Sequence, residues 1–160
     1  MADMRSAHQI IPRLWLGDRN AAHDPSFLRS NNITVVFNCT KDIPFSKLVP
    51  RAYRIPVDDN LRDEEINNMT RWSPEIVAKI IHEYNTGANI LVHCFAGMQR
   101  SACAVAMTLI ALYKQPTDNV IRFIRNKRPI AFFPEANFEK SIRTFDADIH
   151  RAMAAKNYGK

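Results

Sequence analysis

The sequence predicts an α/β fold: a single domain with a central, mostly parallel sheet flanked by helices. Two observations support this. Short runs of β-branched and apolar residues, at 33–39 and 89–93, are typical of strands buried on both faces. They alternate with segments whose apolar residues recur at helical spacing, which is the order of a sheet whose strands are joined by helices. At 160 residues the chain suits one core, so we expect residues 1–160 to form a single domain with its core at about 8–150.

The first third of the chain predicts short strands and loops. Residues 9–16 are apolar but include Pro12, which cannot donate within a sheet, so they predict an edge strand or a hairpin. Residues 25–29 suit one or two helical turns, and 33–39 predict a buried strand. A second strand is expected at 53–57, emerging from a proline-containing loop.

Helices dominate the remainder. Ser73, Pro74 and Glu75 predict a helix start, because serine is a good N-cap, proline fits the first helical position and an acid suits the first turn. Gly87 is expected to end that helix. The later predicted elements are, in order, a strand at 89–93, a helix at 102–113, a helix entered at 116–117, and a last helix beginning around 134–137.

The loop between the strand at 89–93 and the following helix is the first candidate site. Ligands of parallel sheets bind beyond the carboxyl ends of strands. Seven positions from Cys94 to Arg100 can close a ring whose backbone N–H groups point inward, and such a ring at a helix N-terminus binds a tetrahedral anion. Gly97 can supply the angles of the turn. The candidate phosphate-binding residues are Phe95, Ala96, Gly97, Met98, Gln99 and Arg100.

Two side chains of this loop carry chemistry. Arg100 has a planar fork that can grip two phosphate oxygens. Cys94 lies at the base of the ring, where comparable surroundings lower a thiol pKa from about 8.5 to roughly 3.5–7.5. A buried structural thiol beside an ordinary surface arginine would be the alternative. The order strand, Cys, Gly, Arg, Ser, apolar helix favours a role for Cys94 as nucleophile over that of a structural thiol.

The stretch His93-Cys94-x-x-Gly97-x-x-Arg100-Ser101 resembles the signature of the dual-specificity branch of the cysteine-dependent protein tyrosine phosphatase superfamily at every fixed position. The similarity continues over nearly the whole chain. It includes residues 11–17, 33–40, 54–60 and 128–130, and the pair at 137–138.

This resemblance implies a cysteine-dependent dual-specificity protein phosphatase with a phosphatase-type phosphate-binding loop between strand and helix. Cys94 would attack phosphorus to form a phosphocysteine intermediate, while Arg100 and the loop amides stabilise the equatorial oxygens. Ser101 would hydrogen-bond the Cys94 sulfur and help it depart. An aspartate would protonate the leaving oxygen and then activate water.

Two adjacent acids can fill that last role. Counting from the pair at 55–56, the resemblance assigns the general acid to Asp59, and Asp58 is expected to be a solvated loop acid.

Four further residues have structural expectations. His93 should point away from the face of Cys94 and hydrogen-bond backbone, because adjacent strand residues alternate between faces. Asn137 is expected to cap a helix or support a loop and not to take part in catalysis. Cys39 and Cys103 lie in apolar stretches and are expected to be buried, inert thiols rather than disulfide partners of Cys94.

The expected substrates are phosphorylated proteins. A compact chain without an extra aromatic wall predicts a shallow site that admits phosphotyrosine, phosphoserine and phosphothreonine. An RNA 5′-triphosphatase is the first alternative: the net charge of +6 permits nucleic acid, but no stacking pattern favours it. A phosphoinositide phosphatase is less favoured, because such relatives tend to place lysines within the loop. A non-catalytic phospho-binding module is the remaining possibility.

Composition limits the cellular setting. Three cysteines are too few for a disulfide framework, and the charged start lacks an apolar stretch, so we expect an intracellular protein, cytoplasmic and/or nuclear. The longest apolar run falls short of the roughly 20 residues of a membrane span. The five histidines show no ligand spacing, and we expect neither metal nor cofactor. The oligomeric state stays open.

Overall fold

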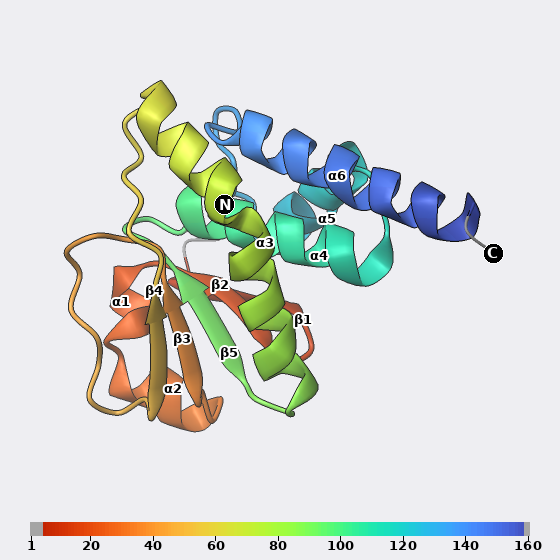
Figure 1. Ribbon diagram of the computed structural model, residues 1–160. Coiled ribbons are helices and arrows are strands. Elements are labelled where there is room, and N and C mark those ends of the chain that lie inside the picture. Colours follow the sequence, from red (N-terminus) through yellow and green to blue (C-terminus); the bar gives the residue numbers. More distant parts are fainter. Residues whose placement is uncertain (1–4, 159–160) are drawn as a thin grey trace.

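The computed structural model describes residues 5–158 and shows an α/β fold built on one five-stranded sheet (Figure 1). The strands are β1 (Ala7–Ile11), β2 (Leu14–Gly17), β3 (Val35–Asn38), β4 (Arg51–Arg54) and β5 (Ile90–His93). Their order across the sheet is β1-β2-β5-β3-β4. Only β1 runs antiparallel to its neighbour, so the predicted mostly parallel sheet is confirmed.

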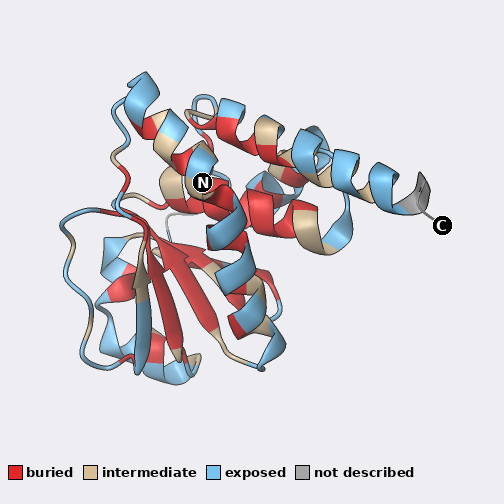
Figure 2. Cartoon of the chain, in the orientation of Figure 1, coloured by how far each residue is buried: buried red, intermediate tan, exposed pale blue. Residues whose placement is uncertain are grey.

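Helices cover both faces of the sheet. The two short helices α1 (Arg19–Ala22) and α2 (Pro25–Ser30) pack on one face. The opposite face is covered by α3 (Asp63–Asn85), α4 (Arg100–Tyr113), α5 (Thr117–Lys127) and α6 (Glu139–Tyr158), which Figure 1 shows grouped together. The strand side chains alternate accordingly: Val35 and Phe37 join the larger core, and Val36 joins the core beneath α1 and α2. Figure 2 shows the inner strands β3 and β5 buried throughout.

The prediction of a helix start at Ser73 is wrong. The helix α3 begins at Asp63, with three acids in its first turn, and Pro74 lies inside it. Proline leaves one carbonyl of the preceding turn without its usual N–H partner. Here that carbonyl, of Thr70, accepts a hydrogen bond from the Ser73 hydroxyl at 2.8 Å. The Ser73 hydroxyl therefore replaces the missing backbone donor, and α3 continues through Pro74 instead of starting there.

The hairpin interpretation of residues 9–16 is confirmed, with a turn at Pro12 and Arg13. Its second strand, β2, lies inside the sheet between β1 and β5. The strand expected at 53–57 is found slightly earlier, at β4.

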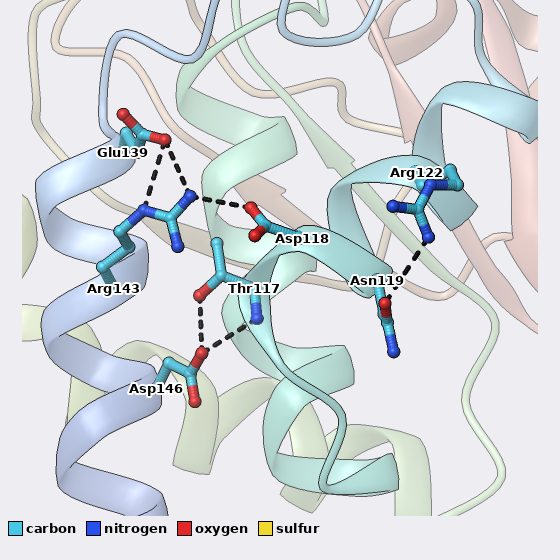
Figure 3. A network of polar contacts seen from close by, with 7 residues as sticks. All are labelled: Thr117, Asp118, Asn119, Arg122, Glu139, Arg143 and Asp146. Carbon is cyan, nitrogen blue, oxygen red and sulfur yellow. Dashed lines mark hydrogen bonds and ion pairs between the residues drawn. The ribbon is translucent and has the colours of Figure 1, made fainter.

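A polar network fixes the start of α5 against α6 (Figure 3). One carboxylate oxygen of Asp146 accepts hydrogen bonds from the Thr117 N–H at 2.8 Å and from its hydroxyl at 2.7 Å. Beside it, Arg143 contacts Asp118 at 2.7 Å and Glu139 at 3.0 Å. This network anchors α5, whose following loop borders the site described next.

Candidate active site

The predicted phosphate-binding loop, residues 94–99, connects the C-terminal end of β5 to the first residue of α4, Arg100. Since β5 lies between β2 and β3, the loop opens at the middle of the sheet. Gly97 has a positive φ of +68°, which glycine adopts without strain. A Cβ there would lie 2.5 Å from the Gly17 carbonyl oxygen, so no side chain fits.

Groups outside the loop contact each of its carbonyl oxygens from residue 94 to residue 98. They are His93 Nδ1 at Cys94 O (3.2 Å), Arg19 Nη1 at Phe95 O (3.1 Å), Arg128 Nη2 at Ala96 O (3.1 Å), Arg128 Nε at Gly97 O (2.9 Å), and Phe132 N–H at Met98 O (2.7 Å). The C=O and the following N–H of a trans peptide point in opposite directions. Drawing the carbonyls outward therefore turns the N–H groups of residues 95–99 toward the inside of the loop.

Cys94 lies at the floor of this loop and is almost completely buried. Its Sγ is 3.1 Å from the Ser101 hydroxyl. Burial by itself raises the pKa of the Cys94 thiol. The hydroxyl and N–H of Ser101, the charge of Arg100 and the N–H of Gly97 outweigh burial, so the pKa is lowered. The site therefore favours a thiolate.

Arg100 is the first residue of α4. Its Nη1 donates to the Val57 carbonyl at 2.9 Å, which fixes the guanidinium. Its Nε is buried and has no hydrogen-bond partner among residues 5–158. A buried donor of this kind is costly unless a ligand satisfies it. Cys94 and Arg100 line one pocket of about 310 Å³ together with Asp59.

The two candidate acids have different surroundings. Asp59 lines the pocket of Cys94, and the side-chain amide of Asn137 donates to its two carboxylate oxygens at 2.9 and 3.3 Å. Asp58 instead contacts Lys41 at 3.2 Å, and its N–H donates to Glu65. Asn137 was expected to support a loop, and the structure adds a direct contact with Asp59.

The remaining loop side chains surround the opening. Phe95 is about half exposed, and Met98 and Ala96 are partly buried. The Gln99 side chain is held by three hydrogen bonds: it donates to the carbonyls of Phe133 (3.2 Å) and Glu135 (2.9 Å) and accepts from the N–H of Asn137 (2.9 Å). Gln99 thus holds the loop that carries Asn137.

Sequence reasoning missed two arginines. The fully buried Arg128 and the exposed Arg19 both hold carbonyls of the phosphate-binding loop. Arg128 lay in a stretch used only for the resemblance, and Arg19 had no signal at all. An arginine directly before a proline, outside any helical stripe, is the one sequence signal that could have marked Arg128.

His93, Cys39 and Cys103 agree with their structural expectations. His93 is buried, its ring lies beside backbone, and desolvation lowers its pKa to about 4, so it is neutral at pH 7. Cys39 and Cys103 are free, fully buried thiols whose pKa values burial raises well above the usual range. Neither is poised to react.

Among residues 5–158, no three His, Cys, Asp or Glu side chains gather as a metal-binding group. Nor does any helix described there have the length and hydropathy needed to cross a membrane.

A buried thiol of lowered pKa, at the floor of a strand–loop–helix anion cradle, defines the class of cysteine-based phosphatase domains. The family model for "Dual specificity phosphatase, catalytic domain" matches residues 14–148. The chain therefore belongs to the dual specificity phosphatase family.

Individual relatives agree with this assignment. The chain is 32% identical to mouse dual specificity protein phosphatase 2 over 124 residues, which are 76% of this chain and 37% of that protein. It is 26% identical to the Slingshot homolog protein phosphatase of Xenopus laevis over 99% of this chain and 22% of that protein. The chain thus spans less than two fifths of either relative. The crystal structure of human DUSP28 superposes with a TM-score of 0.81 at 19% identity, covering 93% of this chain and 98% of that one, and shares the fold.

Proposed function

We propose that this chain hydrolyses phosphotyrosine, phosphoserine and phosphothreonine monoesters of proteins through a phosphocysteine intermediate. One observation carries the proposal. The Cys94 sulfur, with its lowered pKa, lies at the floor of a loop whose N–H groups point inward, in the same pocket as Arg100. Such an arrangement can bind a phosphoryl group and attack it.

In the first step, the Cys94 thiolate attacks phosphorus in line with the leaving oxygen. The S–P bond forms as the P–O bond breaks, and the carboxylic acid of Asp59 gives its proton to the departing oxygen. Three equatorial oxygens carry the charge in the transition state. The loop N–H groups and the unpartnered Nε of Arg100 are the donors for these oxygens.

In the second step, water attacks the phosphocysteine. The Asp59 carboxylate accepts a proton from that water, the S–P bond breaks, and inorganic phosphate and the Cys94 thiolate are released. The Ser101 hydroxyl, 3.1 Å from the sulfur, stabilises the thiolate as leaving group.

Phosphoproteins are favoured over highly charged phosphate substrates by the side chains around the loop. The residues between Cys94 and Arg100 are all uncharged. Phe95 and Phe133 are exposed at the pocket and give it apolar walls. A substrate with several phosphates would find no cation within the loop other than Arg100, so RNA triphosphate ends and phosphoinositides rank lower.

The test compares three substrate classes with a nucleophile variant. Wild-type protein should hydrolyse para-nitrophenyl phosphate and phosphopeptides, and Cys94→Ser should be inactive on both. If phosphate is released faster from triphosphate-ended RNA or from phosphoinositides than from phosphopeptides, that substrate class takes the place of phosphoproteins in the proposal. Binding of phosphopeptides with no turnover by wild-type protein would leave a non-catalytic binding module.

A further inference from the structure

Arg19, the first residue of α1, makes three contacts with Phe95 of the phosphate-binding loop. Its backbone N–H donates to the Phe95 carbonyl at 3.2 Å, and its Nη1 donates to the same oxygen at 3.1 Å. The guanidinium carbon also lies 3.8 Å from the centre of the Phe95 ring. An exposed side chain 76 positions away in sequence thus holds both the backbone and the ring of Phe95.

These contacts determine one peptide unit of the loop. Because the Phe95 carbonyl points out toward Arg19, the N–H of Ala96 on the same peptide plane points inward. The groups that chiefly lower the pKa of Cys94 are Ser101, Arg100 and the N–H of Gly97. The N–H of Ala96, turned inward by the outward Phe95 carbonyl, faces the space in which an oxygen of the bound anion would lie.

We propose that Arg19 is a positioning residue of the phosphate cradle, which holds the Phe95–Ala96 peptide so that its N–H faces the phosphoryl oxygens. The proposal rests on the proposed function, since it assumes that the loop binds a phosphoryl group. Arg19 acts through Phe95 and touches no reacting atom. It governs affinity for the oxyanion and leaves the ionisation of the nucleophile unchanged.

Two substitutions separate the two hydrogen bonds of Arg19. Arg19→Ala removes the side-chain donor and the contact with the ring, but keeps the backbone N–H. Arg19→Pro removes both donors, because proline has no N–H. Proline is well tolerated at the first position of a helix. The preceding residue, Asp18, is already extended, with φ of −103° and ψ of −176°, which is the conformation that proline prefers before it.

The probes are tungstate, an inert tetrahedral anion, and para-nitrophenyl phosphate. We expect tungstate to bind about threefold more weakly to Arg19→Ala and about tenfold or more weakly to Arg19→Pro, as expected for one and then two hydrogen bonds. The kcat/KM for para-nitrophenyl phosphate should fall in the same order. The pH midpoint of Cys94 alkylation by iodoacetamide should stay at the wild-type value in both variants.

Arg29→Ala is the matched control. Arg29 is exposed on the neighbouring helix α2, and its side chain makes no hydrogen bond within the part of the chain that the structure describes. The Arg29→Ala variant should bind tungstate with wild-type affinity. Each Arg19 comparison is repeated at high salt, because loss of a rim charge is screened whereas a misplaced N–H is not.

Four results would overturn the proposal. They are unchanged tungstate affinity in Arg19→Pro, a deficit that disappears at high salt, an equal deficit in Arg29→Ala, and a shifted alkylation midpoint with a lowered melting temperature. The last would mean that the whole loop had unfolded. If wild-type protein binds tungstate but hydrolyses no phosphate ester, the proposed function fails, and the tungstate comparison still decides the role of Arg19.

Discussion

Replacing each of two adjacent acids by its amide should give very different enzymes. Asp59 shares the pocket of Cys94 and receives hydrogen bonds from Asn137, whereas Asp58 contacts Lys41 at 3.2 Å. In Asp59→Asn the side-chain shape is kept and the amide oxygen can still accept from Asn137. The fold should therefore be preserved while the transferable proton is lost. Asp58→Asn loses only an exposed ion pair, which is worth about 0–1 kcal/mol.

The size of the effect depends on the leaving group. General acid catalysis contributes roughly 10²–10⁴-fold when the departing oxygen needs a proton. We expect Asp59→Asn to lose about that factor in kcat/KM on a phosphotyrosine peptide, because kcat/KM reports the steps up to the phosphocysteine and not the later attack of water. The loss of kcat/KM should be several-fold at most on para-nitrophenyl phosphate, whose nitrophenolate leaves unprotonated. Asp58→Asn should stay within about twofold of wild type on both substrates, because its ion pair lies at the surface.

The assay is steady-state hydrolysis of both substrates, with circular dichroism to confirm that each variant is folded. A comparable loss of kcat/KM for Asp59→Asn on both leaving groups would contradict the role of proton donor. So would a larger loss for Asp58→Asn than for Asp59→Asn on the phosphotyrosine peptide. Either outcome would mean that the acid was assigned to the wrong side chain.

Three further predictions follow from the same structure. Gly97→Ala forces a Cβ within 2.5 Å of a backbone oxygen at a φ of +68°, so phosphatase activity should fall by at least about 100-fold; near wild-type turnover would refute the described loop. Ser101→Ala removes a hydrogen bond to the Cys94 thiolate worth about 1.5–3 kcal/mol, so dephosphorylation should slow about 10–100-fold, and stopped-flow should reveal a burst of nitrophenolate. Asp146→Asn weakens the anchor of α5 and should lower the melting temperature by about 2–4 °C at pH 7. Partial burial raises the pKa of Asp146, but hydrogen bonds from Thr117 outweigh burial and lower that pKa below 3.8. The stabilisation by ionised Asp146 is therefore present above pH 3.8 and is lost as the pH falls through the lowered pKa. The melting temperatures of wild type and Asp146→Asn should converge over that range.

Local pattern was enough to predict the strand, the loop and the helix that form the site. The run at 89–93 and the apolar stripe at 102–113 each carry a strong periodic signal, and they became β5 and α4. A loop of fixed length between two such elements has few possible paths. The positions of Cys94, Gly97 and Ser101 therefore followed from the sequence.

Local sequence pattern was insufficient where a side-chain hydrogen bond, within one helical turn or to a distant residue, determined the local structure. The Ser-Pro pair at 73–74 reads as a helix start, yet the Ser73 hydroxyl occupies the carbonyl of Thr70 and the helix continues through it. Local pattern also gives no sign that the Gln99 side chain reaches the carbonyl of Glu135, 36 positions away, and phosphate binding by Gln99 stays a prediction. No spacing rule encodes contacts that only the folded chain creates.

The cradle is a property of the fold as much as of the nine-residue signature. Arg19 at the start of α1, and Arg128 and Phe132 in the loop after α5, hold four of its carbonyls outward. The inward N–H groups that result need a negative charge to satisfy them, and the Cys94 thiolate supplies it when no substrate is bound. The arrangement of the loop N–H groups and the charge of the Cys94 thiolate therefore depend on each other.

Since the pKa of Cys94 in the folded chain lies below its ordinary 9.0, ionisation of this thiol stabilises the folded state. That contribution is complete above pH 9 and shrinks as the pH falls toward the folded pKa. The same donors that make the sulfur a nucleophile therefore make its charge part of what holds the loop in shape. A substitution that loosens the outward carbonyls near Gly97 should weaken the nucleophile and the loop together, whereas loosening Phe95 should affect the bound anion alone.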